Sequence, residues 1–211
     1  MENDPVFVLL AGGKSERMGV DKGLLKYKLT FWILEQLNRI STTKIKKVYL
    51  GLGYNYEHYF DAIPWLKDAL TNNIDYQGLK VKTIVNPTPE LGSFSTLQTV
   101  LKNIKFNGDV LVIPIDVPLL NSEELNNILS VKNNIVIPNF EGKNGHPIKM
   151  AANFWQKLIS LDVSKENSRL DLQIKKLNSE EITIIKVNDA STVKNLNAKT
   201  AWISYLNEEK N

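Results

Sequence analysis

Short, uninterrupted apolar runs alternate along the chain with longer segments in which apolar residues recur every three or four positions. Uninterrupted runs are typical of strands buried on both faces of a mainly parallel sheet, and the helical spacing indicates amphipathic helices. The predicted strands are Val6–Leu10, Lys47–Gly51, Val81–Val85, Val110–Ile115, Asn134–Ile137 and Ile182–Val187. The predicted helices are Thr30–Ile40, Ser95–Ile104, Ser122–Ser130, Ala151–Leu161, Ser168–Leu177 and Ala198–Leu206. This alternation predicts a layered α/β fold with right-handed crossovers.

Composition and charge narrow the range of partners. Of the 211 residues, 43% are hydrophobic and 23% charged, and no repeat or linker divides them, so residues 1–211 are expected to form one globular domain. A net charge of +3 is too small to indicate nucleic acid or an anionic membrane as a partner. The absence of cysteine excludes disulfides and thiolate metal sites. An acidic N-terminus unlike a signal peptide, and no apolar run of about 20 residues, predict a cytoplasmic protein.

The segment from Leu9 to Lys22 carries the strongest chemical signal. It begins where the first apolar run ends, and its two glycines, Gly12 and Gly13, allow left-handed or closely approaching backbone. A lysine, a serine, an arginine and a second lysine follow within ten residues. A glycine turn lined with cations suits a di- or triphosphate, because backbone N–H groups point at the anion while Lys and Arg neutralise it.

Two widespread phosphate-binding loops do not fit this segment. In the P-loop a glycine precedes Gly-Lys-Ser by five residues, but Val8 stands at that position before Gly13. The dinucleotide fingerprint needs three glycines spaced Gly-x-Gly-x-x-Gly. Gly51 and Gly53 supply its first two, and Tyr56 stands where the third is required.

The segment Leu10-Ala11-Gly12-Gly13-x-Ser15-x-Arg17-Met18-Gly19-x-Asp21-Lys22 resembles the signature loop of the MobA-like NTP transferases. This family includes the molybdenum cofactor guanylyl- and cytidylyltransferases and, more distantly, the sugar-phosphate nucleotidyltransferases. Further segments are similar to motifs of the family: Asn86-Pro87 with Gly92-Ser93-Phe94-Ser95-Thr96-Leu97, Ile115-Asp116-Val117-Pro118-Leu119-Leu120, Gly145-His146-Pro147, and Asn195-Leu196-Asn197. The resemblance therefore extends over most of the chain.

The resemblance implies a three-layer, Rossmann-like fold of the nucleotide-diphospho-sugar transferase type, with a mainly parallel sheet and helices on both faces. An NTP would bind above the carboxyl ends of the strands. A phosphorylated acceptor would attack the α-phosphate, and pyrophosphate would leave with Mg²⁺. Arg17 and Lys22 are the candidates for catalysis. The implied nucleotide-binding residues are Leu10, Ala11, Gly12, Gly13, Ser15, Arg17, Lys22, Asn86 and Ser95.

Asp116 and Asn197 are the predicted Mg²⁺ ligands. Asp116 directly follows a buried strand, where a carboxylate is costly unless it is paired or bound to a metal. Mg²⁺ accepts one or two carboxylates together with phosphate oxygens and waters. Cytidylyltransferases of the family commonly have Asp at the second position. Asn197 contributes a neutral amide oxygen instead, as in guanylyltransferase relatives.

Other candidates have both a structural and a functional explanation, and both stay open here. His146 is predicted either to contact the acceptor or to pack at a turn, and Ser95 either to contact a ligand or to cap its helix. Asp21 suits a base or ribose contact as well as a local cap. His58 is expected on an aromatic surface helix, and Lys14 either in solvent or at the ligand.

These observations predict a cytoplasmic, Mg²⁺-dependent nucleotidyltransferase that uses GTP or CTP and acts on a molybdopterin-type cofactor. Asn195 and Asn197 favour guanylyl transfer, whereas Gly145-His146-Pro147 favours cytidylyl transfer. The resemblance also implies a molybdoenzyme or a cofactor chaperone as partner. One alternative is transfer to a sugar or alcohol phosphate. Another, motivated by the missing second carboxylate, is nucleotide binding with weak or no catalysis.

Overall fold

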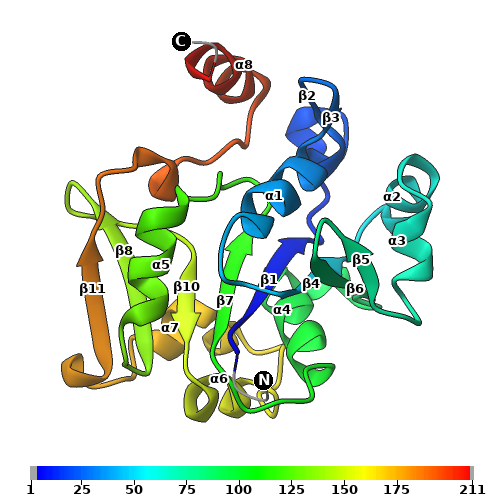
Figure 1. The fold of residues 1–211 in the computed structure, drawn as a ribbon. Coiled ribbons are helices and arrows are strands. Elements are labelled where there is room, and N and C mark those ends of the chain that lie inside the picture. Colours follow the sequence, from blue (N-terminus) through cyan, green and yellow to red (C-terminus); the bar gives the residue numbers. More distant parts are fainter. Residues whose placement is uncertain (1–3, 210–211) are drawn as a thin grey trace.

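The computed structural model describes residues 4–209, which are built around one large mixed sheet (Figure 1). Its strands run in the order β11–β8–β10–β7–β1–β4–β6–β5, and β9 pairs with β8. β10 is antiparallel to both of its neighbours, whereas the pairs around β1 are parallel. The strands are β1 (Val6–Ala11), β4 (Lys47–Leu52), β5 (Ile74–Tyr76), β6 (Leu79–Val85), β7 (Val110–Pro114), β8 (Ile135–Phe140), β9 (Lys143–Asn144), β10 (Ile148–Met150) and β11 (Ile182–Lys186).

Helices cover both faces of the sheet and complete a three-layer fold (Figure 1). The side chains of β1 alternate between the faces: Phe7 and Leu9 join the core under α1 and α5, and Val6 and Val8 the core under α4, α6 and α7. The mainly parallel sheet with helices on both faces is therefore confirmed. The helices are α1 (Trp32–Ser41), α2 (Tyr56–Ala62), α3 (Trp65–Asp68), α4 (Ser93–Lys102), α5 (Ser122–Ser130), α6 (Ala152–Leu158), α7 (Leu170–Ile174) and α8 (Lys199–Glu208).

The carboxyl ends of β1, β4, β6 and β7 meet at one edge of the sheet, because these strands are parallel. The residues that follow them, among them Gly12, Gly53, Asn86 and Asp116, therefore come together at that edge. The order of the strands along the chain reverses at β1, which has β4 on one side and β7 on the other. Open α/β sheets usually bind ligands at such a switch point.

The structure differs from the predicted elements at their boundaries and in the shortest elements. Thr30 and Phe31 form strand β3 (Thr30–Phe31), which pairs with β2 (Lys26–Tyr27), so α1 begins at Trp32. Helix α4 begins at Ser93, two residues before the predicted start. The apolar pattern does not reveal β10, because three residues are too few to show a period.

Helix α8 is held against α1 by a group of aromatic and charged side chains, here called the Arg39 cluster: Tyr27, Trp32, Glu35, Arg39, Trp202, Tyr205 and Glu209. The rings of Trp32 and Trp202 meet edge to face with centroids 5.3 Å apart. Arg39 donates to Glu35 at 2.9 Å, to the Tyr205 hydroxyl at 2.8 Å and to Glu209 at 2.9 Å. These bonds join the C-terminal helix to the first one.

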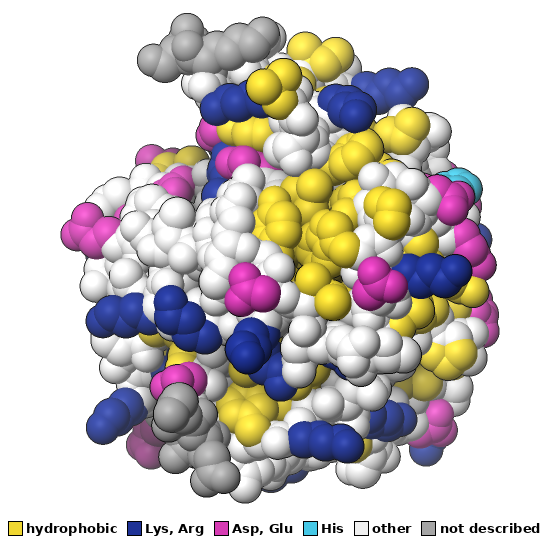
Figure 2. All heavy atoms as spheres, turned by 45° about the vertical axis from the view of Figure 1, so that its right-hand side comes forward, with side chains coloured by type: hydrophobic (Ala, Val, Ile, Leu, Met, Phe, Trp, Pro, Cys, Tyr) yellow, Lys and Arg dark blue, Asp and Glu magenta, His cyan; other side chains and the backbone are white. Residues whose placement is uncertain are grey.

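The surface seen in Figure 2 carries Lys and Arg in several separate groups, and hydrophobic side chains gather in its upper part. At the tip of the β2–β3 hairpin the side chain of Leu29 is fully exposed. Within residues 4–209, no helix combines the length and the apolar character that crossing a bilayer requires.

Candidate functional site

Close packing at the ends of β1 and β4, against a side chain in one case and against backbone in the other, requires glycine at two positions. A Cβ atom on Gly12 would lie 2.7 Å from Oγ1 of Thr96 at the start of α4, and one on Gly53 would lie 2.6 Å from the Gly12 carbonyl oxygen. The Gly12 carbonyl also accepts a hydrogen bond from the Tyr54 N–H at 3.2 Å. The first residues of the signature loop are therefore pressed against α4 and the end of β4, while Gly13 is exposed.

The rest of the signature loop is anchored by a buried methionine and a left-handed turn. After Ser15, whose φ is 55°, a short 3₁₀ helix covers Glu16–Met18 and buries the Met18 side chain. The Ser15 hydroxyl accepts a hydrogen bond from the Lys22 N–H at 3.1 Å, which closes the loop on itself. The Arg17 side chain stays exposed to solvent. The loop therefore presents its cations from a fixed backbone.

Lys22, Asp116 and Asn197, here called the Lys22 cluster, come together although they are far apart in the sequence. The Lys22 ammonium lies 2.9 Å from Oδ2 of Asp116, 94 residues away, and also donates to Oδ1 of Asn197. Two backbone hydrogen bonds place Asp116 and Asn197 beside the signature loop. The Ile115 N–H donates to the Leu10 carbonyl oxygen at 2.8 Å, and the Leu196 N–H donates to the Asp116 carbonyl oxygen at 2.7 Å. The predicted catalytic lysine and both predicted metal ligands therefore lie together at one site.

The donor set of the Lys22 cluster fits Mg²⁺. One carboxylate oxygen and one amide oxygen converge on the same point, and such hard oxygen ligands suit this ion. Within residues 4–209, no three His, Cys, Asp or Glu side chains gather to hold a metal. Mg²⁺ does not need an all-protein cage, because it usually keeps waters and binds phosphate oxygens besides one or two carboxylates.

A small cavity of about 200 Å³ brings the predicted phosphate-binding side chains together. Arg17 and Lys22 line it from the signature loop, and Asn197 lines it from the segment before α8. Lys14 and Glu16 also line it, at an ion-pair distance of 3.5 Å from each other. Cations from the signature loop and the amide of Asn197 from another segment thus face the same volume, as a metal-bound triphosphate requires.

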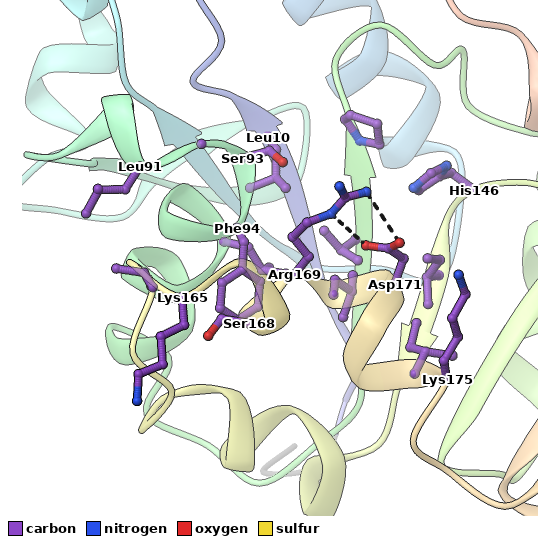
Figure 3. Close-up of a pocket in the computed structure, with 18 of the residues that line it drawn as sticks. Leu10, Leu91, Ser93, Phe94, His146, Lys165, Ser168, Arg169, Asp171 and Lys175 are labelled. Atoms are coloured by element: carbon purple, nitrogen blue, oxygen red, sulfur yellow. Dashed lines mark hydrogen bonds and ion pairs between the residues drawn. The ribbon is translucent and has the colours of Figure 1, made fainter.

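A second, much larger cavity of about 1040 Å³ opens beside the carboxyl ends of β1 and β7 (Figure 3). Leu10 and His146 line it, together with Arg169, which forms an ion pair with Asp171 at 3.1 Å. Burial lowers the pKa of His146, and the charge of Asp116 opposes this shift. The cavity therefore extends from His146, which lies near enough to Asp116 to be influenced by its charge, to the start of α7. No motif of the sequence singles out Arg169, which lies in a segment predicted merely as helix.

Asn86 and Ser95 organise the loop between β6 and α4. The Asn86 amide donates to Ser95 Oγ at 2.8 Å and to Thr96 Oγ1 at 3.0 Å, while its oxygen accepts from the Thr88 N–H at 3.1 Å. Ser95 Oγ lies 2.7 Å from the Gly92 carbonyl, to which it donates. Ser95 is inside α4, so the alternative that it caps the helix is wrong. Their assignment to the nucleotide stays a prediction.

Asp21 fixes the other end of the signature loop. Its side chain is buried and accepts from Asn55 Nδ2 at 3.0 Å, and it lies 2.7 Å from Nδ1 of His58 on α2. Next to it, the Gly23 N–H bonds to the Tyr59 hydroxyl at 3.3 Å. The aromatic helix predicted around His58 exists, and the contact between His58 and Asp21 has no signal in the sequence.

Solved structures with the same architecture include nucleotidyltransferases, and this chain shares the nucleotide-diphospho-sugar transferase fold. Rv0371c from Mycobacterium tuberculosis H37Rv matches with a TM-score of 0.76 at 17% identity, over 98% of this chain and 99% of that chain. A structure of that protein in complex with manganese matches with a TM-score of 0.68 at 16% identity, over 96% and 98%. A nucleotidyl transferase from Methanothermobacter matches with a TM-score of 0.73 at 13% identity, over 98% of this chain and 99% of that chain. The 4-diphosphocytidyl-2C-methyl-D-erythritol synthase from Anaerococcus prevotii matches with a TM-score of 0.71 at 13% identity, over 100% of this chain and 97% of that chain.

A family model described as the MobA-like NTP transferase domain matches residues 7–177, and the chain belongs to that family. Among curated proteins, no sequence matches it significantly. Membership in the family supports nucleotidyl transfer from an NTP to a phosphorylated acceptor as the activity.

Proposed function

We propose that residues 1–211 form one catalytic domain that transfers a nucleoside monophosphate from GTP or CTP to a phosphorylated acceptor, with Mg²⁺ and release of pyrophosphate. The observation that carries this proposal is the meeting of Lys22 with Asp116 and Asn197 beside the signature loop. In a member of an NTP transferase family, that arrangement joins a triphosphate-binding cation to two ligands for its metal.

In this proposal, transfer depends on positioning and charge rather than on covalent help from the protein. An oxygen of the acceptor phosphate attacks the α-phosphorus, and the bond from that phosphorus to the oxygen bridging to the β-phosphate breaks. Arg17 and Lys22 hold the triphosphate and offset the charge that develops on it. Asp116 and Asn197 would hold Mg²⁺, which when bound neutralises the pyrophosphate leaving group.

The acceptor is proposed to lie in the large cavity, with its phosphate toward the Lys22 cluster. His146 and Arg169 both line this cavity, and His146 lies close enough to Asp116 to feel its charge. Because the pKa of His146 is lowered, its ring is neutral at pH 7 and offers one donor and one acceptor. We therefore expect His146→Ala to raise the KM for the acceptor about tenfold, the loss of roughly one hydrogen bond.

The family motifs put a molybdopterin-type cofactor first among the acceptors, with a molybdoenzyme or a cofactor chaperone as the protein that takes the product. The lack of cysteine fits the reducing cytoplasm in which we place the enzyme. The manganese complex of Rv0371c supports a divalent metal, since that protein has the same fold. The alternative of nucleotide binding with weak catalysis is favoured by one observation, the neutral amide of Asn197.

The test begins with thermal unfolding of the purified protein in each NTP with Mg²⁺. Ligand linkage predicts that GTP or CTP raises Tm clearly more than the other nucleotides do. Pyrophosphate release is then measured with a molybdopterin-type acceptor, a sugar phosphate and an alcohol phosphate. Release that requires both Mg²⁺ and one acceptor supports transfer. Stabilisation by an NTP without release in the presence of any of these acceptors supports the binding alternative, and no stabilisation by any NTP contradicts both.

A further inference from the structure

The Lys22 ammonium lies at the point where the two proposed metal ligands converge. It is 2.9 Å from Oδ2 of Asp116 and donates to Oδ1 of Asn197, so it occupies the point between these two oxygens at which a shared cation would be bound. Asn197 has a single side-chain oxygen. A ligand to Mg²⁺ lies at 2.0–2.1 Å from the ion, well inside the distance that a lysine nitrogen keeps. The ammonium and the metal therefore exclude each other from this point.

Charge makes the exclusion stronger. The side chains of Lys22 and Asp116 are 18% and 16% exposed, so water screens their charges poorly. A divalent ion placed on Asp116 while Lys22 stays there would meet a monovalent cation at close range. Asp116 is the one carboxylate of this cluster and cannot neutralise both cations.

We propose that Lys22 closes the metal position in the nucleotide-free protein and that binding of the triphosphate opens it. This inference rests on the proposed function, which makes Lys22 a ligand of the triphosphate. The phosphates compete with Asp116 for the ammonium, and the released carboxylate and amide then receive the metal. Metal and NTP consequently bind with positive coupling, and the factor by which each helps the other is the same.

The backbone around Lys22 suits such an exchange. Its own N–H is bonded to Ser15 Oγ, and the next N–H to the hydroxyl of Tyr59. On the preceding side, Asp21 is bonded to Asn55 and His58. With the backbone held on both sides, the four-carbon side chain is the part that moves. The small cavity lined by Ser15, Arg17 and Lys22 is the space into which it turns.

The test measures Mn²⁺ binding without nucleotide, by the electron paramagnetic resonance signal of free Mn²⁺. Lys22→Met is expected to bind one Mn²⁺ at least about tenfold more tightly than the wild type, because the oxygens are no longer occupied by the ammonium. Lys14→Met is the matched control. It removes a positive charge from the lining of the same cavity, and in the structure Lys14 pairs with Glu16 instead of Asp116. We expect it to change the affinity by less than about threefold, as for a screened charge.

Three outcomes would overturn the proposal: equal Mn²⁺ affinity in the wild type and Lys22→Met, an equal increase of the Mn²⁺ affinity in Lys22→Met and Lys14→Met, or no Mn²⁺ bound by Lys22→Met. Circular dichroism and Tm confirm that each variant is folded. These measurements need no nucleotide and no turnover, so their failure is distinct from failure of the proposed function. A crystal structure of the wild type with an α,β-methylene NTP and Mg²⁺ completes the test. Lys22 should contact a phosphate oxygen there, and a Lys22 still bonded to Asp116 would contradict the exchange.

Discussion

The Lys22 cluster and the Arg39 cluster are each centred on a cation that joins remote segments, yet they differ in what surrounds the charge. Exposure does not separate them, because the Lys22 side chain is 18% exposed and the Arg39 side chain 21%. Arg39 is bonded to two carboxylates and two hydroxyls, and its guanidinium lies over the rings of Tyr27 and Trp32. Lys22 has two oxygen partners and faces a cavity.

This difference separates a cation that stabilises the fold from one that can exchange partners. The planar guanidinium of Arg39 fits several fixed acceptors at once, whereas the ammonium of Lys22 is a point charge on a flexible stem. A triphosphate entering the small cavity can draw Lys22 away from Asp116. Arg39 is instead held by several fixed partners at once, with the rings of Tyr27 and Trp32 and helix α8 packed against it. We therefore expect changes in the Lys22 cluster to affect turnover, and changes in the Arg39 cluster to affect stability.

The largest expected effect is that of Asp116→Ala on turnover. Loss of the carboxylate removes the charged ligand of the proposed metal, so Mg²⁺-dependent pyrophosphate release should fall by at least about 100-fold. The free energy of unfolding should change by less than about 1 kcal/mol, because Lys22 lines a cavity and its ammonium can be hydrated there once the carboxylate is gone. Turnover and urea unfolding measure the two effects. Asp61→Ala, at an exposed position of α2, is the control and should retain wild-type turnover. A variant that unfolds instead of losing turnover would remove the distinction between the clusters.

Arg39→Met should have the opposite result. It leaves Glu35 and Glu209 without their shared cation and frees the last helix, so the free energy of unfolding should fall by about 2–3 kcal/mol, slightly less than for a fully buried pair. Urea unfolding measures this change, and Lys157→Met on the exposed side of α6 should stay within about 0.5 kcal/mol of the wild type. At a temperature where Arg39→Met is folded, its turnover should remain within about threefold of the wild type, since the cluster touches no proposed ligand. A large loss of turnover in folded protein would contradict this separation of roles.

The sequence predicts the layers of the fold well, because strands buried on both faces have a plain apolar signal. Val6–Leu10 and Val110–Ile115 are strands within one residue of the predicted bounds. It also indicates the residues of the Lys22 cluster, through their resemblance to a family. It does not predict that Lys22 bonds to Asp116. That contact depends on the parallel register of β1 and β7, in which Leu10 lies opposite Pro114, and strand register is a property of the whole sheet.

Other contacts have no sequence signal for local reasons. The pair between Asp21 and His58 depends on Asn55, whose left-handed φ of 54° turns the chain into α2. Arg169 reaches the large cavity from the residue before α7, and a single arginine at the start of a short helix has no pattern around it. Glycines are informative where two backbones touch, as at Gly12 and Gly53, but the sequence alone does not show which segment each one meets.

A smaller change tests whether the hydroxyls of the Arg39 cluster contribute beyond the rings. Tyr205→Phe keeps the ring against Trp32 and Trp202 and removes the oxygen that accepts from Arg39 at 2.8 Å. The free energy of unfolding should fall by about 1 kcal/mol, the usual contribution of one hydrogen bond, slightly more when the donor is charged. Urea unfolding at pH 7 measures it. An unchanged urea midpoint would mean that aromatic packing alone holds α8 against α1. The hydrogen bond from Arg39 to the Tyr205 hydroxyl would then not contribute to the stability of the Arg39 cluster.

The smallest effect, at high pH, also distinguishes the clusters. Burial, together with the hydrogen bond that Tyr27 donates to Glu209, raises the pKa of Tyr27 to about 12, although the charge of Arg39 opposes the shift. Since the pKa is about 10 in the unfolded chain, the folded state holds this proton more tightly, and its contribution is complete below pH 10 and lost as the pH rises toward 12. At pH 10.5 the loss due to Tyr27 should be about 0.8 kcal/mol. Urea unfolding at pH 9 and 10.5 should show a larger decrease in the free energy of unfolding for the wild type than for Tyr27→Phe. In a titration followed by absorbance at 295 nm, the wild type should show one tyrosine with a raised pKa that this variant lacks. Equal decreases in the free energy of unfolding of both proteins would mean that Tyr27 is not protected from ionisation. The Arg39 cluster would then be more open to water than its hydrogen bonds indicate.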